Sequence, residues 1–317
     1  MKTNVRIGLI GAGAWGQNHL RVLGQMGILK AVADTSSQRL SKIKEDFKGV
    51  KTTESYKELL AMPDIDAVVI ATPAFTHYKV ALDSLAAGKH TFVEKPLALT
   101  KKEGEILVFD AKKAGRILMV GHLLHYHPAI IELKKIIERG ELGKILHIAA
   151  HRLNLGKIRT EENVMWSIAP HDISLILNFF GESPTQVHVE GASYLQKNIP
   201  DLAHIHLHFS DNRNAHIYTS WLNPYKERKF TIIGDKGMAV FDDMAEHKLT
   251  IFDSFTEYDE RKNPIAVNKG TRVVDLPNSE PVLNELTHFV SCIEKKSTPL
   301  TDGEEGVRVL SVLEECK

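Results

Sequence analysis

The sequence has few cysteines, no excess of either charge and no long apolar segment. Its two cysteines among 317 residues, Cys292 and Cys316, form no disulfide framework and lack the spacing of metal ligands. Forty basic residues balance forty acidic ones, which argues against a surface that binds nucleic acid. No apolar run approaches the roughly 20 residues that a membrane span needs. We therefore expect neither a nucleic-acid partner nor a membrane-embedded protein.

Length and the first residues add two expectations. A strand-like pattern begins about five residues after Met1, which leaves no room for a signal peptide, so we expect a cytoplasmic protein. A chain of this length exceeds what one hydrophobic core usually serves. We expect two domains, residues 1–122 and 123–317.

The most informative segment is an apolar run that ends in glycines. Gly11, Gly13 and Gly16 follow it in the order Gly-x-Gly-x-x-Gly, and an amphipathic segment comes next. In a strand–turn–helix unit the first glycine permits a tight turn, the second lets the backbone approach a pyrophosphate, and the third allows close helix packing. The helix N-terminus offers free N–H groups to the phosphates. The expected cofactor contacts are Gly11, Ala12, Gly13, Ala14, Trp15 and Gly16.

A carboxylate follows the next apolar segment. Asp34 comes after Gly16 at about the spacing, roughly 20 residues, of a group that bonds the ribose hydroxyls. A carboxylate here would repel a 2′-phosphate, which favours NAD over NADP. Arg39, the nearest cation, comes late in the sequence for a phosphate clamp. Thr35 is a further expected contact, and either Thr35 or Ser36 can cap the following helix.

Strand-like and helix-like patterns alternate to about residue 122, which predicts a doubly wound parallel sheet. Such sheets bind ligands at the carboxyl ends of their strands. This rule selects Thr72 and Pro73 after one expected strand and Glu94 and Lys95 after the next. The position of His77, in the first turn of the helix between them, fits a cofactor contact and helix-start chemistry about equally well.

The second half of the chain predicts an α+β domain with a large open, mostly antiparallel sheet. Residues 145–151 are strand-like, 152–159 loop-like, and 167–180 form one expected helix. Seven further strands are expected at 187–193, 202–209, 214–221, 229–233, 238–241, 248–252 and 271–276. The few helices of this half cannot cover both faces of such a sheet, so we expect a homodimer or homotetramer formed through it.

Two polar segments of this half have simple explanations. His204, His206 and His208 alternate with apolar residues and would share one strand face. No carboxylate or thiolate pattern accompanies them, so we expect no metal site. Residues 257–262 alternate in charge and are expected to form a solvated loop.

Glu94-Lys95-Pro96, taken with the glycine segment, Thr72-Pro73 and the later His171-Asp172, resembles the Gfo/Idh/MocA oxidoreductases. The resemblance covers nearly the whole chain. It implies an N-terminal Rossmann domain, a C-terminal domain with a large open sheet, bound NAD(P), and oxidation or reduction of a sugar or polyol hydroxyl. In this family a lysine and a histidine flank the reacting carbon, and the matching residues are Lys95 and His171.

The sequence departs from many members of that family near the histidine. Ser167 stands four residues before His171, where many members carry Asp, and Ser174 stands where a second Asp is often found. A Lys/His pair without the upstream Asp resembles the sugar-nucleotide branch, which oxidises the 3-hydroxyl of UDP-N-acetylglucosamine or its uronic acid. The product would be a 3-keto sugar.

The chemistry of alcohol oxidation assigns a role to each of the two residues. His171 would be the general base, since an imidazole titrates near ambient pH. Lys95 would donate a hydrogen bond to the same oxygen and stabilise developing alkoxide. Arg152, Lys157 and Arg159 could contact a substrate diphosphate, although surface loop charges explain them nearly as well. Other expected substrate contacts are Tyr126, Asn154, Trp166, Ser167 and Trp221.

Three functions remain after this reading. The first is an NAD-dependent sugar-nucleotide 3-dehydrogenase, and the second is a free sugar or inositol dehydrogenase of the same family. The third is a non-catalytic, NAD-binding regulator, against which the presence of both Lys95 and His171 argues.

Overall fold

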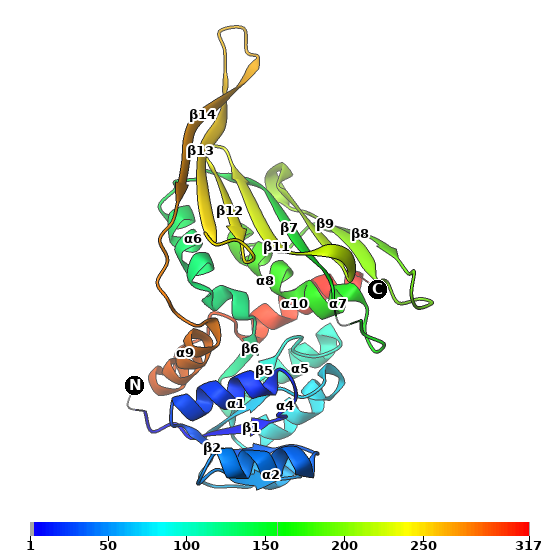
Figure 1. Ribbon diagram of the computed structural model, residues 1–317, viewed down its shortest axis with the longest axis vertical. Helices are drawn as coiled ribbons and strands as arrows, with labels where there is room; N and C mark the ends of the chain where they lie inside the picture. Colours follow the sequence, from blue (N-terminus) through cyan, green and yellow to red (C-terminus); the bar gives the residue numbers. More distant parts are fainter. Residues whose placement is uncertain (1–2, 157, 317) are drawn as a thin grey trace. The chain divides into compact units, whose positions relative to one another are not determined.

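The computed structural model describes residues 3–156 and 158–316, which divide into two compact units (Figure 1). The first unit comprises Met1–Tyr126 and Glu280–Ser311, and the second comprises His127–Ser279 and Val312–Lys317. The sequence placed the boundary at residue 122 and assigned all later residues to the second domain. The structure instead returns the segment 280–311 to the first unit.

The first unit contains one parallel sheet of six strands in the order β3-β2-β1-β4-β5-β6. This order confirms the doubly wound Rossmann arrangement. The strands are β1 (Ile7–Ile10), β2 (Leu29–Ala33), β3 (Lys51–Thr53), β4 (Ala67–Ile70), β5 (His90–Glu94) and β6 (Leu118–Gly121). Strand β3 was not expected, because its three residues, Lys-Thr-Thr, give no apolar signal.

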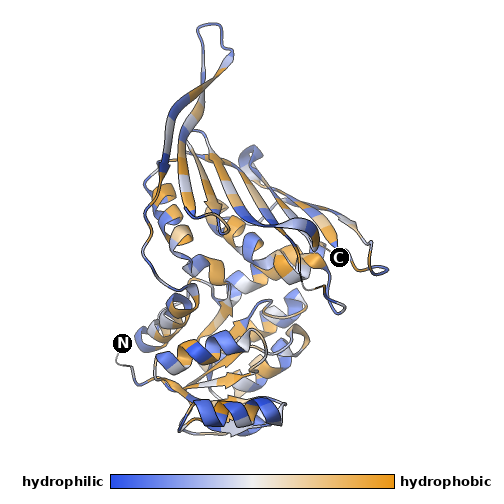
Figure 2. Ribbon diagram, in the orientation of Figure 1, coloured by the Kyte–Doolittle hydropathy of each residue, from blue (hydrophilic) through white to orange (hydrophobic). Residues whose placement is uncertain are grey.

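Helices connect the strands of this unit. Ser36 caps α2 through its side chain, which accepts a hydrogen bond from the amide of Arg39, and Thr100 caps α5 in the same way. Figure 2 shows hydrophobic residues along the central strands. The helices are α1 (Gly16–Gln25), α2 (Ser37–Asp46), α3 (Tyr56–Leu60), α4 (His77–Ala86) and α5 (Lys101–Ala114), with short 3-10 turns η1 (Ala74–Thr76) and η2 (Leu123–Tyr126).

Helix α9 (Pro281–Lys295) explains why the C-terminal segment belongs to the first unit. Its apolar residues Leu286, Phe289 and Val290 are fully buried in the same hydrophobic cluster as Leu9 of β1. Helix α10 (Gly303–Glu315) follows, and a Cβ on its Gly306 would lie 2.8 Å from the side chain of Val120. From the sequence, closing helices are expected at 282–295 and 304–313; the structure confirms both, but the core that α9 completes was not expected.

The second unit contains an eight-stranded sheet in the order β14-β13-β12-β11-β7-β10-β9-β8. Among the described strands of this sheet, only β7 and β10 pair in parallel, so the expected open, mostly antiparallel sheet is confirmed. The strands are β7 (Ile145–Leu155), β8 (Gln186–Ala192), β9 (Leu202–His208), β10 (Asn214–Ser220), β11 (Leu222–Gly234), β12 (Met238–Asp242), β13 (Leu249–Tyr258) and β14 (Pro264–Val273). Its helices are α6 (Pro128–Glu138), α7 (Val164–Ile168) and α8 (Pro170–Phe180), with η3 at Ser210–Asn212.

Three local expectations in this unit were wrong. Strand β7 continues to Leu155, because its end pairs with β11, so Arg152 and Asn154 lie on a strand rather than in a loop. The expected single helix is two helices, since Pro170 lacks an N–H and starts α8 anew. Residues 257 and 258 belong to β13, which with β14 forms a hairpin that extends beyond the other strands (Figure 1).

The histidines of β9 share one face with those of its neighbours. His204 stacks on Tyr218 of β10 with ring centroids 4.3 Å apart, and His206 lies opposite His216. Burial, together with the surrounding histidines, lowers the pKa of His216 to about 4. Within the residues that the structure describes, no group of three or more His, Cys, Asp or Glu side chains is arranged to hold a metal ion.

A search of the described helices finds none that is both long enough and apolar enough to cross a membrane.

Two substitutions on α9 should separate its buried face from its exposed face. Phe289→Ala removes a fully buried ring from the first unit and should lower the free energy of unfolding by about 3–5 kcal/mol. Leu283→Ala, on the same helix but 38% exposed, should cost less than about 1 kcal/mol. Denaturant unfolding of both variants measures the difference. Equal losses would contradict the placement of α9 in this core.

Candidate functional site

The glycine-rich loop lies at the carboxyl end of β1. Gly11 has a φ of +91°, and a Cβ there would lie 2.8 Å from the carbonyl oxygen of Ala71. A Cβ on Gly16 would lie 2.2 Å from the carbonyl oxygen of Gly11, so a side chain at either position would collide with backbone. A Cβ on Gly13, in contrast, would meet no atom within 4 Å. Gly13 therefore faces open space, which fits backbone that approaches a pyrophosphate.

Asp34 follows the last residue of β2 and is held from three directions. Its Oδ2 accepts a hydrogen bond from the amide of Ala12 at 2.8 Å, and its Oδ1 accepts one from the amide of Ser36 at 2.8 Å. Arg39 donates to Oδ1 through Nη2 at 2.7 Å and Nε at 3.1 Å. Burial raises the pKa of Asp34, but these donors outweigh it and the pKa is lowered. Asp34 is therefore a fixed carboxylate beside the glycine loop.

The ion pair with Arg39 was not foreseen. Arg39 lies in the first turn of α2, and its spacing along the chain did not indicate that it would reach the carboxylate of Asp34. Its side chain is 48% exposed, and its guanidinium forms an ion pair with the carboxylate of Asp34. Thr35, between the two, is exposed.

His77 ties together the loops that follow β4 and β5. Its Nδ1 lies 2.7 Å from the carbonyl oxygen of Pro96, and its Nε2 lies 2.9 Å from that of Thr72. The ring is buried, and burial lowers its pKa. The side chain of Thr76 donates to the hydroxyl of Thr72 at 2.6 Å. The structure thus gives His77 two backbone partners, while its contact with a cofactor stays a prediction.

Glu94 is the last residue of β5, and Lys95 follows it at the same edge of the sheet. The carboxylate of Glu94 accepts hydrogen bonds from the indole Nε1 of Trp15 at 2.5 Å and from the backbone amide of Lys95 at 3.3 Å. His19 Nε2 lies 2.6 Å from the same oxygen that Trp15 reaches. Sequence reasoning missed His19, which the helical spacing of four residues from Trp15 could have indicated.

Tyr126, like Lys95, is an expected substrate contact that the structure assigns to the first unit. Its ring is buried, and its hydroxyl lies 3.3 Å from Oγ1 of Thr301. Burial raises the pKa of this hydroxyl far above its usual value. Tyr126 is therefore part of the packing between η2 and the C-terminal segment.

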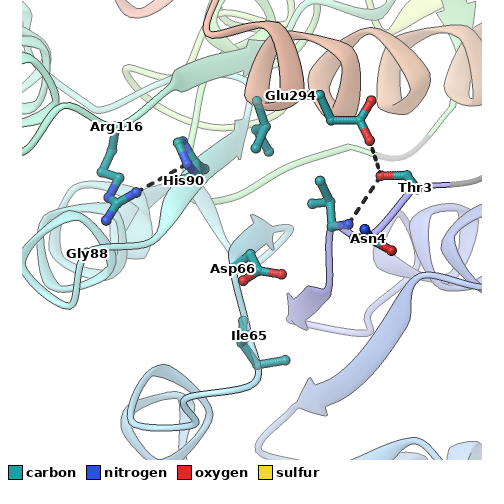
Figure 3. Close-up of a pocket in the computed structure, with 10 residues that line it drawn as sticks. Thr3, Asn4, Ile65, Asp66, Gly88, His90, Arg116 and Glu294 are labelled. Carbon is teal, nitrogen blue, oxygen red and sulfur yellow. Dashed lines mark hydrogen bonds between the residues drawn. The ribbon is translucent and has the colours of Figure 1, made fainter.

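A cavity of about 690 Å³ in the first unit lies away from the glycine loop. It is found at the amino ends of β1, β4 and β5, where Arg116 and His90 lie on one side of Asp66, and Thr3 and Glu294 on the other (Figure 3). None of the expected site residues lines it. Because doubly wound sheets bind ligands at the carboxyl ends of their strands, the glycine loop rather than this cavity is the candidate nucleotide site.

In the second unit, Arg152 and Asp172 form a buried ion pair. Arg152 donates to the two carboxylate oxygens of Asp172 through Nε at 2.7 Å and Nη2 at 2.8 Å. Asp172 lies in the first turn of α8, next to His171. Its negative charge is stabilised there by the positive end of the helix dipole. The pair therefore fixes the start of the helix that carries His171. The guanidinium of Arg152, which was expected to contact a substrate diphosphate, is therefore bonded to Asp172.

The remaining expected substrate contacts lie on different elements of this unit. Asn154 lies against Gly156, since a Cβ on that glycine would be 1.9 Å from the Asn154 amide nitrogen. Arg159 pairs with Glu162 at 3.6 Å. Lys157 lies outside the described residues. The buried members of the set are Trp166 and Ser167 on α7 and Trp221 between β10 and β11.

The residues of the first unit fit a bound dinucleotide. A tight turn at Gly11, open space at Gly13 and the N-terminus of α1 would accommodate a diphosphate, and the carboxylate of Asp34 would accept hydrogen bonds from ribose hydroxyls. A nicotinamide dinucleotide supplies a hydride acceptor when it is bound. The fold and this loop define a dinucleotide-dependent oxidoreductase domain.

Family comparisons agree with the geometry. Residues 5–122 match the model of the oxidoreductase family with an NAD-binding Rossmann fold, Gfo/Idh/MocA, and residues 130–240 match a C-terminal domain model of the same family. The chain belongs to the Gfo/Idh/MocA oxidoreductase family and is an NAD-dependent dehydrogenase.

Individual relatives cover nearly the whole chain. The UDP-N-acetylglucosamine 3-dehydrogenase of Acidithiobacillus ferrooxidans is 26% identical over 97% of this chain and 95% of its own length. Its solved structure matches with a TM-score of 0.86 over 98% of this chain and 95% of that chain. The myo-inositol 2-dehydrogenase of Thermotoga maritima is also 26% identical, over 96% of this chain and 93% of its own.

Two glycine substitutions should separate binding from folding. Gly13→Ala adds a methyl group to open space, so it should leave the thermal midpoint nearly unchanged while weakening NADH binding about tenfold or more. Gly16→Ala places a methyl group 2.2 Å from backbone oxygen and should destabilise the protein by about 1–3 kcal/mol. Thermal unfolding and NADH titration of each variant test this. Normal NADH affinity in Gly13→Ala would contradict a pyrophosphate at this loop.

Asp34→Asn should change the choice of cofactor. The variant keeps the shape of the side chain but removes the charge that repels a 2′-phosphate and leaves Arg39 without its carboxylate partner. We expect the ratio of NADPH to NADH dissociation constants to fall by about tenfold or more. Titration with both cofactors gives this ratio, and Lys51→Gln on β3 serves as a control for loss of an exposed charge. An unchanged ratio would show that Asp34 does not select the cofactor.

Proposed function

We propose that this protein oxidises a secondary hydroxyl of a nucleotide-linked sugar, with UDP-N-acetylglucosamine and its 3-hydroxyl as the leading substrate. The observation that carries the proposal is the full-length similarity, in sequence and in structure, to the UDP-N-acetylglucosamine 3-dehydrogenase of A. ferrooxidans. The Lys95 and His171 pair and the serine at position 167 support the same branch. The product is the 3-keto sugar.

The proposed chemistry divides between two side chains. Lys95 donates a hydrogen bond to the substrate hydroxyl and stabilises the negative charge that develops on its oxygen. His171 accepts the proton of that hydroxyl, and the hydride leaves the same carbon for the nicotinamide ring. The Arg152–Asp172 ion pair holds the first turn of α8 and so orients His171.

A second candidate substrate is a free inositol or sugar. The similarity to the T. maritima myo-inositol 2-dehydrogenase is as extensive, and Arg152 pairs with Asp172, which removes one cation from those considered for a diphosphate. A polyol substrate needs no such cation. The two candidates differ in whether the nucleotide is required for turnover.

Substrate identity is tested by incubation of the protein with NAD and a panel of UDP-sugars, free sugars and inositols. We expect NADH absorbance to rise with UDP-N-acetylglucosamine and not with free N-acetylglucosamine or myo-inositol. Turnover of the free polyols with no turnover of any UDP-sugar would replace the first proposal by the second.

Two variants test the roles of the proposed catalytic residues. Lys95→Met should lower kcat by about 10²–10³-fold, because it removes a donor to the developing alkoxide. His171→Asn should lower kcat by about 10²–10⁴-fold and abolish the fall in rate that accompanies protonation of an imidazole as the pH is lowered. Each variant must keep the wild-type thermal midpoint. If His171→Asn keeps a wild-type rate and pH profile, another group is the base.

A further inference from the structure

Trp15 joins the glycine-rich loop to the loop that carries Lys95. Its indole Nε1 donates to Oε1 of Glu94 at 2.5 Å, although the residue as a whole is 44% exposed. The other carboxylate oxygen, Oε2, accepts from the backbone amide of Lys95 at 3.3 Å. One buried carboxylate therefore bonds to both segments, which are far apart in the sequence.

The carboxylate of Glu94 has little freedom to move between these partners. His19, one turn after Trp15 on α1, places its Nε2 2.6 Å from Oε1. The ring of His19 packs edge-on against Phe92, two residues before Glu94 on the same face of β5, with centroids 5.4 Å apart. A Cβ on Gly121 of the adjacent strand would lie 3.0 Å from the carboxylate. Because the described residues leave no free space around the carboxylate, a movement of the Trp15 indole would also move Glu94.

Glu94 and Glu285 are both buried carboxyl groups, and their pKa values are shifted in opposite directions. Burial raises the pKa of Glu94, but the bonds from His19 and Trp15 and the charge of Lys95 outweigh it, and the pKa is lowered. Glu285 of α9 is also buried, and its burial together with the charge of Glu94 raises the pKa of Glu285 well above its usual value. Within the described residues, Oε1 of Glu285 has no hydrogen-bond partner. The hydrogen bonds to Glu94 therefore favour its charged form, and that charge in turn disfavours ionisation of Glu285.

We propose that Trp15 is a positioning residue for Lys95: its indole–carboxylate bond to Glu94 couples the conformation of the glycine-rich loop to the backbone of Lys95. A dinucleotide that orders the loop thereby also orders the amide of Lys95. The proposal rests on the catalytic role proposed above for Lys95. The link between the glycine-rich loop and Glu94 is thus made by the side chain of Trp15 and not by the backbone of the loop.

The first test follows Trp15 directly by fluorine NMR of the full chain labelled with 5-fluorotryptophan. The chain has three tryptophans, so the Trp15 resonance is identified by its loss in Trp15→Phe. We expect Glu94→Gln to shift this resonance and to leave those of Trp166 and Trp221 in place. NADH should shift the same resonance in the wild type. A Trp15 resonance that ignores Glu94→Gln would overturn the proposal.

The second test follows Lys95 by hydrogen exchange of the peptide that spans residues 94–97, in which Pro96 has no amide. Trp15→Phe keeps an aromatic ring but loses the donor, so the Lys95 amide should exchange roughly tenfold faster. NADH should slow exchange in the wild type and much less in Trp15→Phe. The matched control is Arg21→Gln, on the same helix but paired with Glu280 at the surface.

Outcomes of the exchange measurement are unambiguous. Equal exchange at residues 94–97 in Trp15→Phe and the wild type would overturn the coupling, as would an equal change in Arg21→Gln. Trp15→Phe should change the exchange little when Glu94 is already replaced by Ala, because the indole then has no side-chain acceptor to lose. Both tests use NADH alone, so they hold even if UDP-N-acetylglucosamine proves not to be the substrate.

Discussion

The nucleotide-binding edge depends on the close approach of two backbone segments. The helix that starts at Gly16 begins so near the turn at Gly11 that a methyl group at Gly16 would lie 2.2 Å from the Gly11 carbonyl oxygen. This contact fixes where the loop between them runs. Because the loop runs there, the amide of Ala12 reaches Asp34, and the indole of Trp15 reaches Glu94. Loss of this approach would move every contact made by the loop.

Asp34 and Asp172, buried carboxylates of the first and second units, are each satisfied by an arginine on another element. Asp172 is 2% exposed, and both of its carboxylate oxygens accept hydrogen bonds from Arg152, which lies twenty residues earlier. Removing one partner of such a pair leaves an uncompensated buried charge, at a cost of about 3–5 kcal/mol. The pair therefore constrains the strand and the helix that bear it more than it adds to stability. Arg39 and Asp34 make a similar but more exposed pair at the nucleotide loop.

Sequence patterns gave the fold where a segment carries a strong periodic signal. The buried strands β1 and β4 are continuous apolar runs, and the glycine spacing identified the turn that follows β1. The pattern failed where pairing or one residue decides the outcome. Strand β3 has a polar sequence and forms because it pairs with β2, and Pro170 divides a stretch whose apolar periodicity is continuous. Helix α9 was found, but its core is a property of the folded chain.

The sequence by itself determined the family, the nucleotide loop, and the residues at the ends of the parallel strands, because these depend on local spacing and on the types of residue present. Tertiary structure alone decided which partner each charged side chain takes. It directed Arg39 and Arg152 to carboxylates and brought Trp15 and His19 to Glu94. The physical reason is that an ion pair or a buried hydrogen bond requires two groups within about 3 Å. Distances between segments remote in the chain are set only when the strands pair and the helices pack.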